Sequence, residues 1–376
     1  MKKIILIGPV YPYKGGISHY TGLLYKSLSE KYETIMISYK LQYPRFLFKK
    51  EQKDFGNMQF KIDQTKFWIN TANPINCIIS ALQILKLKPD LVIFQWWHPY
   101  FAPCYWIMGK IIEKKSRLLF DCHNVFPHES FPLDHWLTKV ALKQANYYIV
   151  HSRQDEKDLL TLKPNALYRK TVLPTFNVFK IQNLSKAAAR RNLELPEDKH
   201  ILLFFGLVRE YKGLKYLLRA MRGVIEKFPD TKLLVAGEFG EDKDSYLQLI
   251  NEQRIGSFVD IYDGYIPDKE VEKFFAACDI VVLPYESATQ SGIVQIAYGF
   301  SKPVVVTDVG GLPEVVQNKK TGYIVEAKRA DELSRVICLF FEKDREQEFK
   351  ENIDKEAYKY SWENIVKIID DLCHMK

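Results

Sequence analysis

Two basic residues stand three positions apart in a short turn bounded by glycines. Arg209 and Lys212 lie between Gly206 and Gly213, and the turn precedes residues 214–227, whose apolar spacing predicts a helix. Two cations beside the free N–H groups of a helix start suit a diphosphate, because together they can donate several charge-assisted hydrogen bonds to one dianion. The alternative interpretation of Arg209 is a surface charge next to a helix.

A second turn could bind the same kind of ligand. Small polar residues ending in Ser291 and Gly292 separate an apolar strand, residues 280–283, from a predicted helix over residues 293–300. The first N–H groups of such a helix have no intrahelical acceptor, and the positive end of the helix dipole lies behind them. The turn therefore favours an anionic or hydroxyl-rich ligand. Its predicted binding residues are Ser291, Gly292, Ile293 and Val294.

The sequence around this turn resembles a known family. The order of Pro284, Ser291-Gly292, Pro303-Val304-Val305 and Gly310-Gly311-Leu312-Pro313-Glu314 is similar to the donor-sugar site of retaining family 4 glycosyltransferases (glycosyl transferases group 1), which have the GT-B fold. That family usually carries two glutamates eight positions apart here. In this chain Gln295 stands at or beside the second position, and the first falls near Ala288, two residues from Glu286.

The resemblance implies roles for four catalytic residues. Lys212 matches the family's lysine in position, whereas the family's arginine usually follows the first glycine directly, where this chain has Leu207. Arg209 would then substitute from two residues later. Gln295 would hydrogen-bond the ribose, and His123 occupies the place of a family histidine beside the reacting sugar.

The resemblance also implies donor-binding residues outside the second turn. Glu286 or Gln290 would contact the sugar, and the turn with Tyr265 and Ile266 would support the base. These residues, with the glycines expected near the phosphates, are Gly15, Gly16, Gly206, Tyr265, Ile266, Glu286 and Gln290. For Gly15 the alternative is a turn that only needs positive φ.

Strand ends in the first half carry further polar residues. A predicted strand over residues 116–121 leads to His123, followed by His128 and Glu129, which are candidates for binding the acceptor. A lone histidine is usually structural, but a position just beyond a strand favours a ligand site. The strand over residues 89–98 ends in Gln95, Trp97 and His98, which could face the acceptor or belong to the core. No Gly-X-Gly-X-X-Gly follows the first strand, so a nicotinamide or flavin site has little support.

The chain of 376 residues is long enough for two domains. Strands alternate with helices in both halves, which predicts two doubly wound parallel sheets. With the resemblance, the fold class is GT-B: two facing Rossmann-like domains with an inter-domain cleft. We expect an N-terminal acceptor-side domain over residues 1–180, a nucleotide-sugar-binding domain over residues 181–355, and a C-terminal helix, residues 356–376, that crosses back to the first domain with Ser361 as its cap.

Composition limits the partners. The formal net charge is +8, but basic residues are dispersed and no nucleic-acid-binding module appears, so nucleic acid is not expected. No apolar run is long enough to cross a bilayer. Six scattered cysteines indicate reduced thiols of a cytoplasmic protein rather than disulfides or zinc. The basic, aromatic segment from Tyr39 to Lys53 favours either a peripheral contact with the inner membrane face or a solvated loop.

Together these observations predict a retaining, metal-independent glycosyltransferase of cell-envelope polysaccharide synthesis that uses a UDP- or GDP-sugar. The acceptor would be a lipid-linked or envelope glycan. No cofactor is expected, because the nucleotide sugar is a co-substrate. Two alternatives remain open: a nucleotide-sugar epimerase of the same architecture, and a non-catalytic nucleotide-binding scaffold of a polysaccharide assembly complex.

Overall fold

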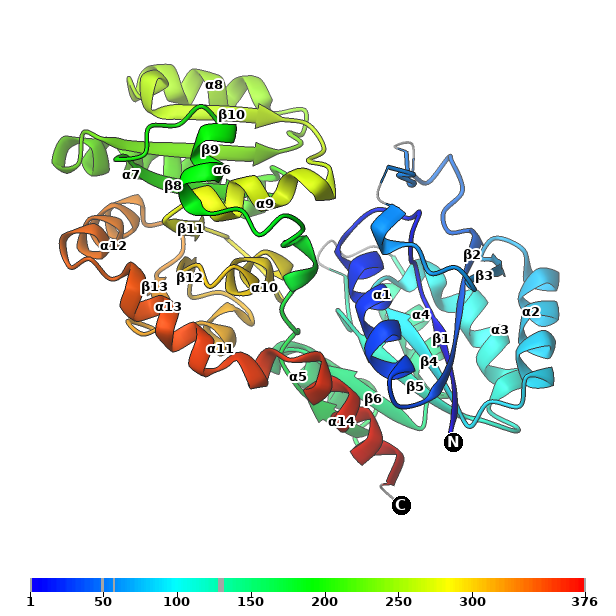
Figure 1. Cartoon of the computed structure of the whole chain (residues 1–376). Coiled ribbons are helices and arrows are strands. Elements are labelled where there is room, and N and C mark those ends of the chain that lie inside the picture. Colours follow the sequence, from blue (N-terminus) through cyan, green and yellow to red (C-terminus); the bar gives the residue numbers. More distant parts are fainter. Residues whose placement is uncertain (1, 49–50, 57, 128–131, 375–376) are drawn as a thin grey trace. The chain divides into compact units, whose positions relative to one another are not determined.

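The computed structural model describes residues 2–48, 51–56, 58–127 and 132–374. The chain divides into two compact units, one made of Met1–Val172 with Ser361–Lys376 and the other of Leu173–Tyr360. Each unit contains one parallel sheet with helices packed against it (Figure 1).

The first unit is a sheet of seven parallel strands in the order β3-β2-β1-β4-β5-β6-β7. The strands are β1 (Lys3–Ile7), β2 (Glu33–Leu41), β3 (Lys66–Asn70), β4 (Leu91–Trp96), β5 (Arg117–Cys122), β6 (Tyr147–Val150) and β7 (Leu167–Lys170). Its helices are α1 (Gly16–Ser29), α2 (Pro74–Lys86), α3 (Ala102–Ile112), α4 (Asp134–Leu142), α5 (Arg153–Leu162) and α14 (Trp362–His374). This is the doubly wound order, in which the chain reverses direction between β1 and β4.

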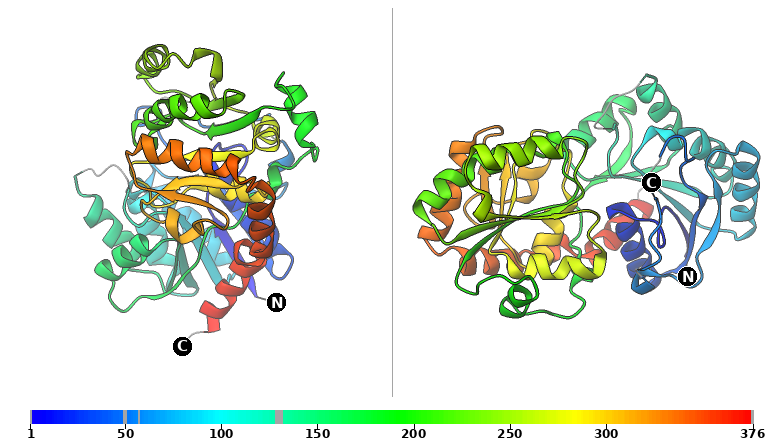
Figure 2. Two further views of the ribbon diagram at one scale, coloured as in Figure 1. Left: turned by 90° about the vertical axis from the view of Figure 1, so that its left-hand side faces the viewer. Right: turned by 90° about the horizontal axis from the view of Figure 1, so that it is seen from above.

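The last helix of the chain completes this first unit. Helix α14 lies alongside α1 (Figures 1 and 2), and the ring centroids of Tyr20 and Trp362 are 5.1 Å apart. Lys31 Nζ lies 2.8 Å from Asp370 Oδ2. The hydroxyl of Ser361 accepts a hydrogen bond of 3.1 Å from the Asn364 N–H, so Ser361 caps the helix start.

The second unit repeats the plan with six parallel strands in the order β10-β9-β8-β11-β12-β13. The strands are β8 (His200–Phe205), β9 (Thr231–Gly237), β10 (Val259–Asp263), β11 (Ile280–Leu283), β12 (Val304–Thr307) and β13 (Gly322–Val325). Its helices are α6 (Lys186–Asn192), α7 (Leu214–Lys227), α8 (Lys243–Glu252), α9 (Asp268–Ala277), α10 (Gly292–Gly299), α11 (Leu312–Val315), α12 (Ala330–Glu342) and α13 (Glu346–Lys355). Here the reversal falls between β8 and β11.

The second unit begins earlier in the chain than residue 181, the start that the sequence suggests. The segment after Val172 packs within this unit: the Phe176 N–H donates to the Gln295 carbonyl over 3.3 Å, and the Thr175 N–H donates to the Tyr360 carbonyl over 2.9 Å. Phe176 and Phe179 are both buried. These contacts place the start of the second unit at Leu173.

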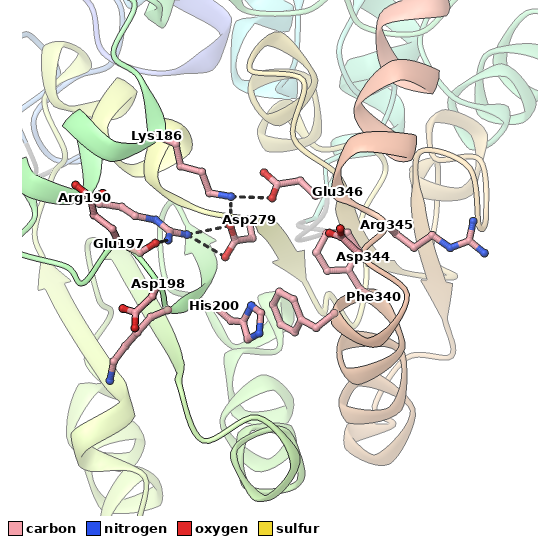
Figure 3. Close-up of a pocket in the computed structure, with 12 residues that line it drawn as sticks. Lys186, Arg190, Glu197, Asp198, His200, Asp279, Phe340, Asp344, Arg345 and Glu346 are labelled. Atoms are coloured by element: carbon pink, nitrogen blue, oxygen red, sulfur yellow. Dashed lines mark hydrogen bonds and ion pairs between the residues drawn. The ribbon is translucent and has the colours of Figure 1, made fainter.

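An ion-pair network holds the amino-terminal ends of β8 and β11 together (Figure 3). Asp279 is buried, and its two carboxylate oxygens Oδ1 and Oδ2 accept from Arg190 Nη2 at 2.9 and 3.1 Å. It also accepts from the Ile201 N–H and pairs with Lys186, which pairs in turn with Glu346. The same residues line a pocket. Because these charges satisfy one another and lie at the strand ends opposite the usual ligand edge, we assign the network to stability.

Candidate functional site

Ligands of doubly wound sheets bind beyond the carboxyl ends of the strands, where the strand order reverses. In the second unit the reversal lies between β8 and β11. The loop after β8 carries Gly206, Arg209 and Lys212, and the loop after β11 leads to Ser291 at the start of α10. The topology therefore brings both predicted phosphate-binding turns to the same edge.

Lys212 reaches from the first turn to the second. A Cβ placed on Gly206 would lie 3.3 Å from Lys212 Nζ and 3.5 Å from Ile293 Cδ1, so the ammonium sits between the β8 loop and the start of α10. The same ammonium lies 5.4 Å from the ring centroid of Tyr285, and the Tyr285 hydroxyl is 3.4 Å from Ser291 Oγ. Within the described residues, Lys212 has no carboxylate partner.

Burial is the main reason that the pKa of Lys212 is lowered, and the nearby Arg209 charge lowers it further. Both effects disfavour the protonated ammonium in the free protein. A bound dianion would reverse this effect, since an opposite charge nearby favours the charged form.

Arg209 is exposed. Its side chain extends toward the loop after β9, because a Cβ on Gly240 would lie 3.0 Å from Arg209 Nη1. Its carbonyl accepts a 3.0 Å hydrogen bond from the Lys212 N–H, which closes the turn. No ion pair ties its guanidinium to another side chain in the part of the chain that the structure describes.

The start of α10 presents free donors. Ser291 makes no side-chain cap there, and the N–H groups of Gly292 and Ile293 have no acceptor among the described residues. Two buried side-chain atoms nearby, Gln290 Nε2 and Gln295 Oε1, also lack a hydrogen-bond partner within the described chain. Unsatisfied buried polar atoms are rare in native proteins, so their clustering here indicates a place for a polar ligand.

Two glycines hold these loops in close contact. Gly310 has φ of 52°, and a Cβ there would lie 1.4 Å from the Ala288 carbonyl oxygen. The adjacent Gly311 N–H donates to the Thr289 carbonyl over 2.8 Å. Gly213 has φ of 65°, and its Cβ would lie 1.9 Å from the Pro284 oxygen. Only glycine fits such positions, which combine positive φ with close backbone approach.

Glu286 is engaged by two lysines. Its carboxylate oxygens lie 2.9 Å from Lys215 Nζ and 3.1 Å from Lys328 Nζ. Burial raises the pKa of this carboxyl, but the two lysines outweigh that effect, so its pKa is lowered. Glu286 is therefore an anion held inside the loop by cations of α7 and of the segment after β13.

The predicted base-binding turn follows β10. Tyr265 is 40% exposed, Ile266 is partly buried, and Gly264 before them has φ of 124°. Beta strands β9 and β10 pair in parallel, so this turn and the loop near Gly240 lie at the same edge of the sheet.

In the first unit, Gly15 and Gly16 start α1 directly after the β1 loop. Gly15 has φ of 104°, and a Cβ at either glycine would meet no atom within 4 Å. The backbone is therefore open here, and the start of α1 carries no side-chain cap. Both residues follow β1, one of the two strands that flank the reversal.

His123 follows β5 and belongs to a hydrogen-bonded chain. Its Nε2 lies 2.6 Å from Gln95 Oε1. Gln95 Nε2 donates to Asp121 Oδ2 over 3.2 Å, and Asp121 Oδ1 lies 2.8 Å from His151 Nε2. The ring of Tyr20 packs edge-on against His123, with centroids 4.6 Å apart.

This chain fixes the tautomer of His123. The Gln95 amide nitrogen donates to Asp121, so its oxygen faces His123 and must accept from the Nε2–H. Burial lowers the pKa of His123 to about 4, which leaves the ring neutral near pH 7. Its Nδ1 is then an acceptor, able to receive a hydrogen bond from a hydroxyl group. Burial raises the pKa of Asp121, but the neighbours led by His151 together lower it below its usual value, so the carboxyl stays ionised.

The structure gives the contacts of the three residues at the β4 strand end. Gln95 is fully buried, so the prediction that it faces an acceptor is wrong; it orients His123 instead. Trp97 donates from Nε1 to the Tyr43 hydroxyl over 3.0 Å, and His98 Nδ1 accepts from the Tyr100 N–H over 3.1 Å. Both therefore have structural contacts. His128 and Glu129 lie outside the described residues.

Sequence reasoning missed the role of Gln95 because it depends on strand register. Gln95 and Asp121 are paired residues of β4 and β5. The sequence did contain one indication of this role: two polar residues, Gln95 and Asp121, each lie near the end of an apolar strand.

In the described residues, no helix is long and apolar enough to cross a membrane, and no group of three potential ligands is arranged to hold a metal ion.

Comparison with known proteins identifies the second unit. The family model described as glycosyl transferases group 1 matches residues 185–360. The second unit is therefore similar to this family over nearly its whole length. Residues from the β8 loop to α10, including Lys212 and Ser291, lie within the matched region.

The relatives extend the same conclusion. The chain is 32% identical over 183 residues to an uncharacterized glycosyltransferase of Methanocaldococcus jannaschii, covering 47% of this chain and 45% of that protein. It is 28% identical over 209 residues to a D-inositol 3-phosphate glycosyltransferase of Streptosporangium roseum, covering 53% and 48%. The matched region thus spans about half the length of these curated relatives.

Solved structures confirm the predicted fold class. Anabaena HepE, solved in complex with UDP-glucose, superposes with a TM-score of 0.73 at 17% identity and covers 100% of both chains. The two Rossmann-like sheets and this match assign the chain to the GT-B fold.

Proposed function

We propose that the protein is a glycosyltransferase that moves a sugar from a UDP- or GDP-sugar to an acceptor hydroxyl, with retention at the anomeric carbon. The observation that carries the proposal is the position of Lys212, a partly buried cation with no carboxylate partner among the described residues, next to the unpaired N–H groups at the start of α10.

The proposed chemistry relies on stabilising the leaving group. The bond between the anomeric carbon and the diphosphate oxygen breaks, and the acceptor oxygen forms the new bond from the same face. The hydroxyl proton passes to the departing phosphate. Lys212, Arg209 and the N–H groups from Ser291 to Val294 stabilise the charge that develops on the diphosphate.

Other residues are proposed to position the donor. Gln295 hydrogen-bonds the ribose through its unsatisfied Oε1, and Gln290 contacts the sugar through Nε2. His123 accepts from a sugar hydroxyl at Nδ1. Glu286 acts through its ion pairs by fixing the loop, because its carboxylate is already bound by two lysines. No carboxylate of this loop is free to act as a nucleophile.

Further donor contacts are proposed at backbone positions. The turn with Tyr265 and Ile266 supports the base, and the open backbone at Gly15 and Gly16 approaches the phosphates. The proposed acceptor is a lipid-linked or cell-envelope glycan, and the proposed location is the cytoplasmic side of the membrane. Support for the acceptor comes from apolar and basic side chains exposed on the first unit.

The test is a thermal-shift panel of UDP- and GDP-sugars followed by product analysis. A donor should raise the melting temperature, since a ligand that binds only the folded state stabilises it. Incubation with that donor and a lipid-linked acceptor should yield a glycosylated product with retained configuration. An isomerised sugar formed from donor alone would identify an epimerase, and binding without any turnover would identify a scaffold.

A further inference from the structure

Helix α2 has an apolar face that no other described part of the chain covers. Ile75, Ile78, Ile79 and Leu82 recur at helical spacing, and they are between 42% and 69% exposed. The opposite face of the helix, which includes Ala81 and Ile84, is buried in the core of the first unit. A helix of a globular unit normally exposes a polar face to water, so this stripe requires an explanation.

The apolar surface continues beyond α2 at both sides. The loop after β2 exposes Phe46, Leu47 and Phe48. The start of this loop is tied to the segment between β3 and α2, because Thr71 Oγ1 donates to the Gln42 carbonyl over 2.7 Å. On the neighbouring helix α3, Trp106 is also exposed. We call this set, Phe46, Leu47, Phe48, Ile75, Ile78, Ile79, Leu82 and Trp106, the α2 face.

Basic residues predominate around the α2 face, although Glu51, Asp90 and Glu113 are also exposed nearby. No aspartate or glutamate occurs between Asp63 and Asp90, whereas Lys86 and Lys88 are exposed at the end of α2. Arg45 is exposed beside the aromatic loop, and Lys114 and Lys115 are exposed just after α3. Apolar side chains bordered by lysines and a tryptophan are typical of surfaces that lie in the headgroup region of an anionic membrane.

We propose that the α2 face docks the protein on an anionic lipid bilayer. The apolar side chains enter the boundary between headgroups and acyl chains, and the flanking cations contact lipid phosphates. Figure 1 shows α2 on the rim of the first unit, and its described packing partners are α3 and β3, which leaves the stripe accessible. Charge complementarity favours the bilayer over a second copy of the chain, because self-association would bring basic flanks together.

The inference deepens the proposed function, since docking would hold the protein beside a lipid-linked acceptor. The aromatic loop follows the carboxyl end of β2, and α2 begins after the carboxyl end of β3. This is the sheet edge at which Gly15 and His123 also lie. One end of the α2 face therefore adjoins the edge where an acceptor is expected.

The test is co-sedimentation of the full chain with vesicles. We expect binding to phosphatidylcholine vesicles that contain phosphatidylglycerol and little binding to phosphatidylcholine alone. Raising the salt from about 0.1 M to about 1 M should weaken binding, because the screening length falls from roughly 10 Å to 3 Å. The double variant Ile79→Asp/Leu82→Asp should lose at least about tenfold in partition coefficient. Its control is Leu247→Asp, an exposed leucine of α8, which should change binding less than about twofold.

A second pair of variants separates charge from apolar contact. Lys86→Gln/Lys88→Gln should lower partition about thirtyfold, since each lysine near an anionic surface contributes roughly fivefold. Lys350→Gln/Lys355→Gln on α13 makes the same change in net charge and should have little effect. All variants should keep the melting temperature and nucleotide-sugar affinity of the parent.

Three results would overturn the proposal: no binding of the parent to anionic vesicles, equal binding of the α2 variants, or a dimer in light scattering that the Ile79→Asp/Leu82→Asp variant dissociates without any effect of lipid. Failure of sugar transfer with intact vesicle binding would instead refute the proposed function and leave the docking surface standing.

Discussion

Replacement of Lys212 by methionine removes one charge and keeps most of the side-chain volume. A charge-assisted hydrogen bond contributes about 1.5–3 kcal/mol, and Coulomb attraction at about 4 Å near a protein surface is about 4 kcal/mol before desolvation is subtracted. Because the ammonium is partly buried and has no carboxylate partner among the described residues, we expect the upper part of the first range. Affinity for a nucleoside diphosphate should fall roughly thirty- to 150-fold.

The same variant should not destabilise the free protein. Burial lowers the pKa of Lys212, which means that its charged form is disfavoured in the unliganded fold. The melting temperature of Lys212→Met without ligand should therefore equal or exceed that of the parent, while the shift caused by UDP should largely disappear. Calorimetric titration and thermal unfolding measure the two effects separately.

The matched control is Lys227→Met at the far end of α7, the helix that follows the Lys212 turn. Lys227 pairs with Glu342 and is largely exposed, so its replacement should leave UDP affinity within about twofold. Affinity of the parent should also weaken as pH rises through the lowered pKa of Lys212, earlier than an ordinary lysine would allow. UDP affinity of Lys212→Met within twofold of the parent, or a clear loss of stability without ligand, would refute this reasoning.

Three further perturbations test the loops and the histidine. Gly310→Ala places a methyl group against the Ala288 oxygen at positive φ, so it should cost at least about 1–3 kcal/mol in unfolding free energy and weaken nucleotide-sugar binding. Gly22→Ala, which meets no atom within 4 Å in α1, is its control in urea titrations. Gln95→Leu removes the acceptor of the His123 Nε2–H. It should lower the free energy of unfolding by about 1–3 kcal/mol and slow sugar transfer. A change in UDP affinity beyond twofold would contradict the role of Gln95 in orienting His123 rather than in binding the nucleotide. The pKa of His123 is about 4 when folded against 6.5 when unfolded, so the unfolded state binds more protons between these values and unfolding free energy should fall as pH drops from 6.5 to 4. His123→Gln should flatten that slope, and an unchanged slope would count against burial as the cause.

Buried elements could be predicted from the sequence with little error. Strand β11 and helix α7 fall at the residues that apolar spacing indicates. Their patterns are strong because one side of the helix, and all of the strand, lies in a core. The edge strand β7, Leu167–Lys170, is harder to predict. Its side chains are half-buried or exposed, so no apolar run marks it.

Other elements are hard to predict because they lie at a sheet edge or pack against helices on several sides. Strand β3 is the outer strand of its sheet, with a register shift against β2, and α3 is apolar on nearly every side because it packs against α2 and α4. In neither element do the apolar residues recur at the regular spacing of a strand or of an amphipathic helix. In the candidate site, residue type alone predicts which turns could bind anions. The orientation of His123 by Gln95 requires the pairing of two strands that are 26 residues apart at the contact, which local patterns do not contain.

The return of α14 to the first unit affects the order of biosynthesis. Residues 361–374 supply the partner of α1, including the Trp362 ring and Asp370, yet they are synthesised only after the whole of the second unit. Until they emerge, the surface of α1 that they cover is exposed, while the second unit already has every strand of its sheet. We therefore expect the second unit to close first during translation, and chaperones that recognise exposed apolar surface to engage α1 until residues 361–374 have emerged.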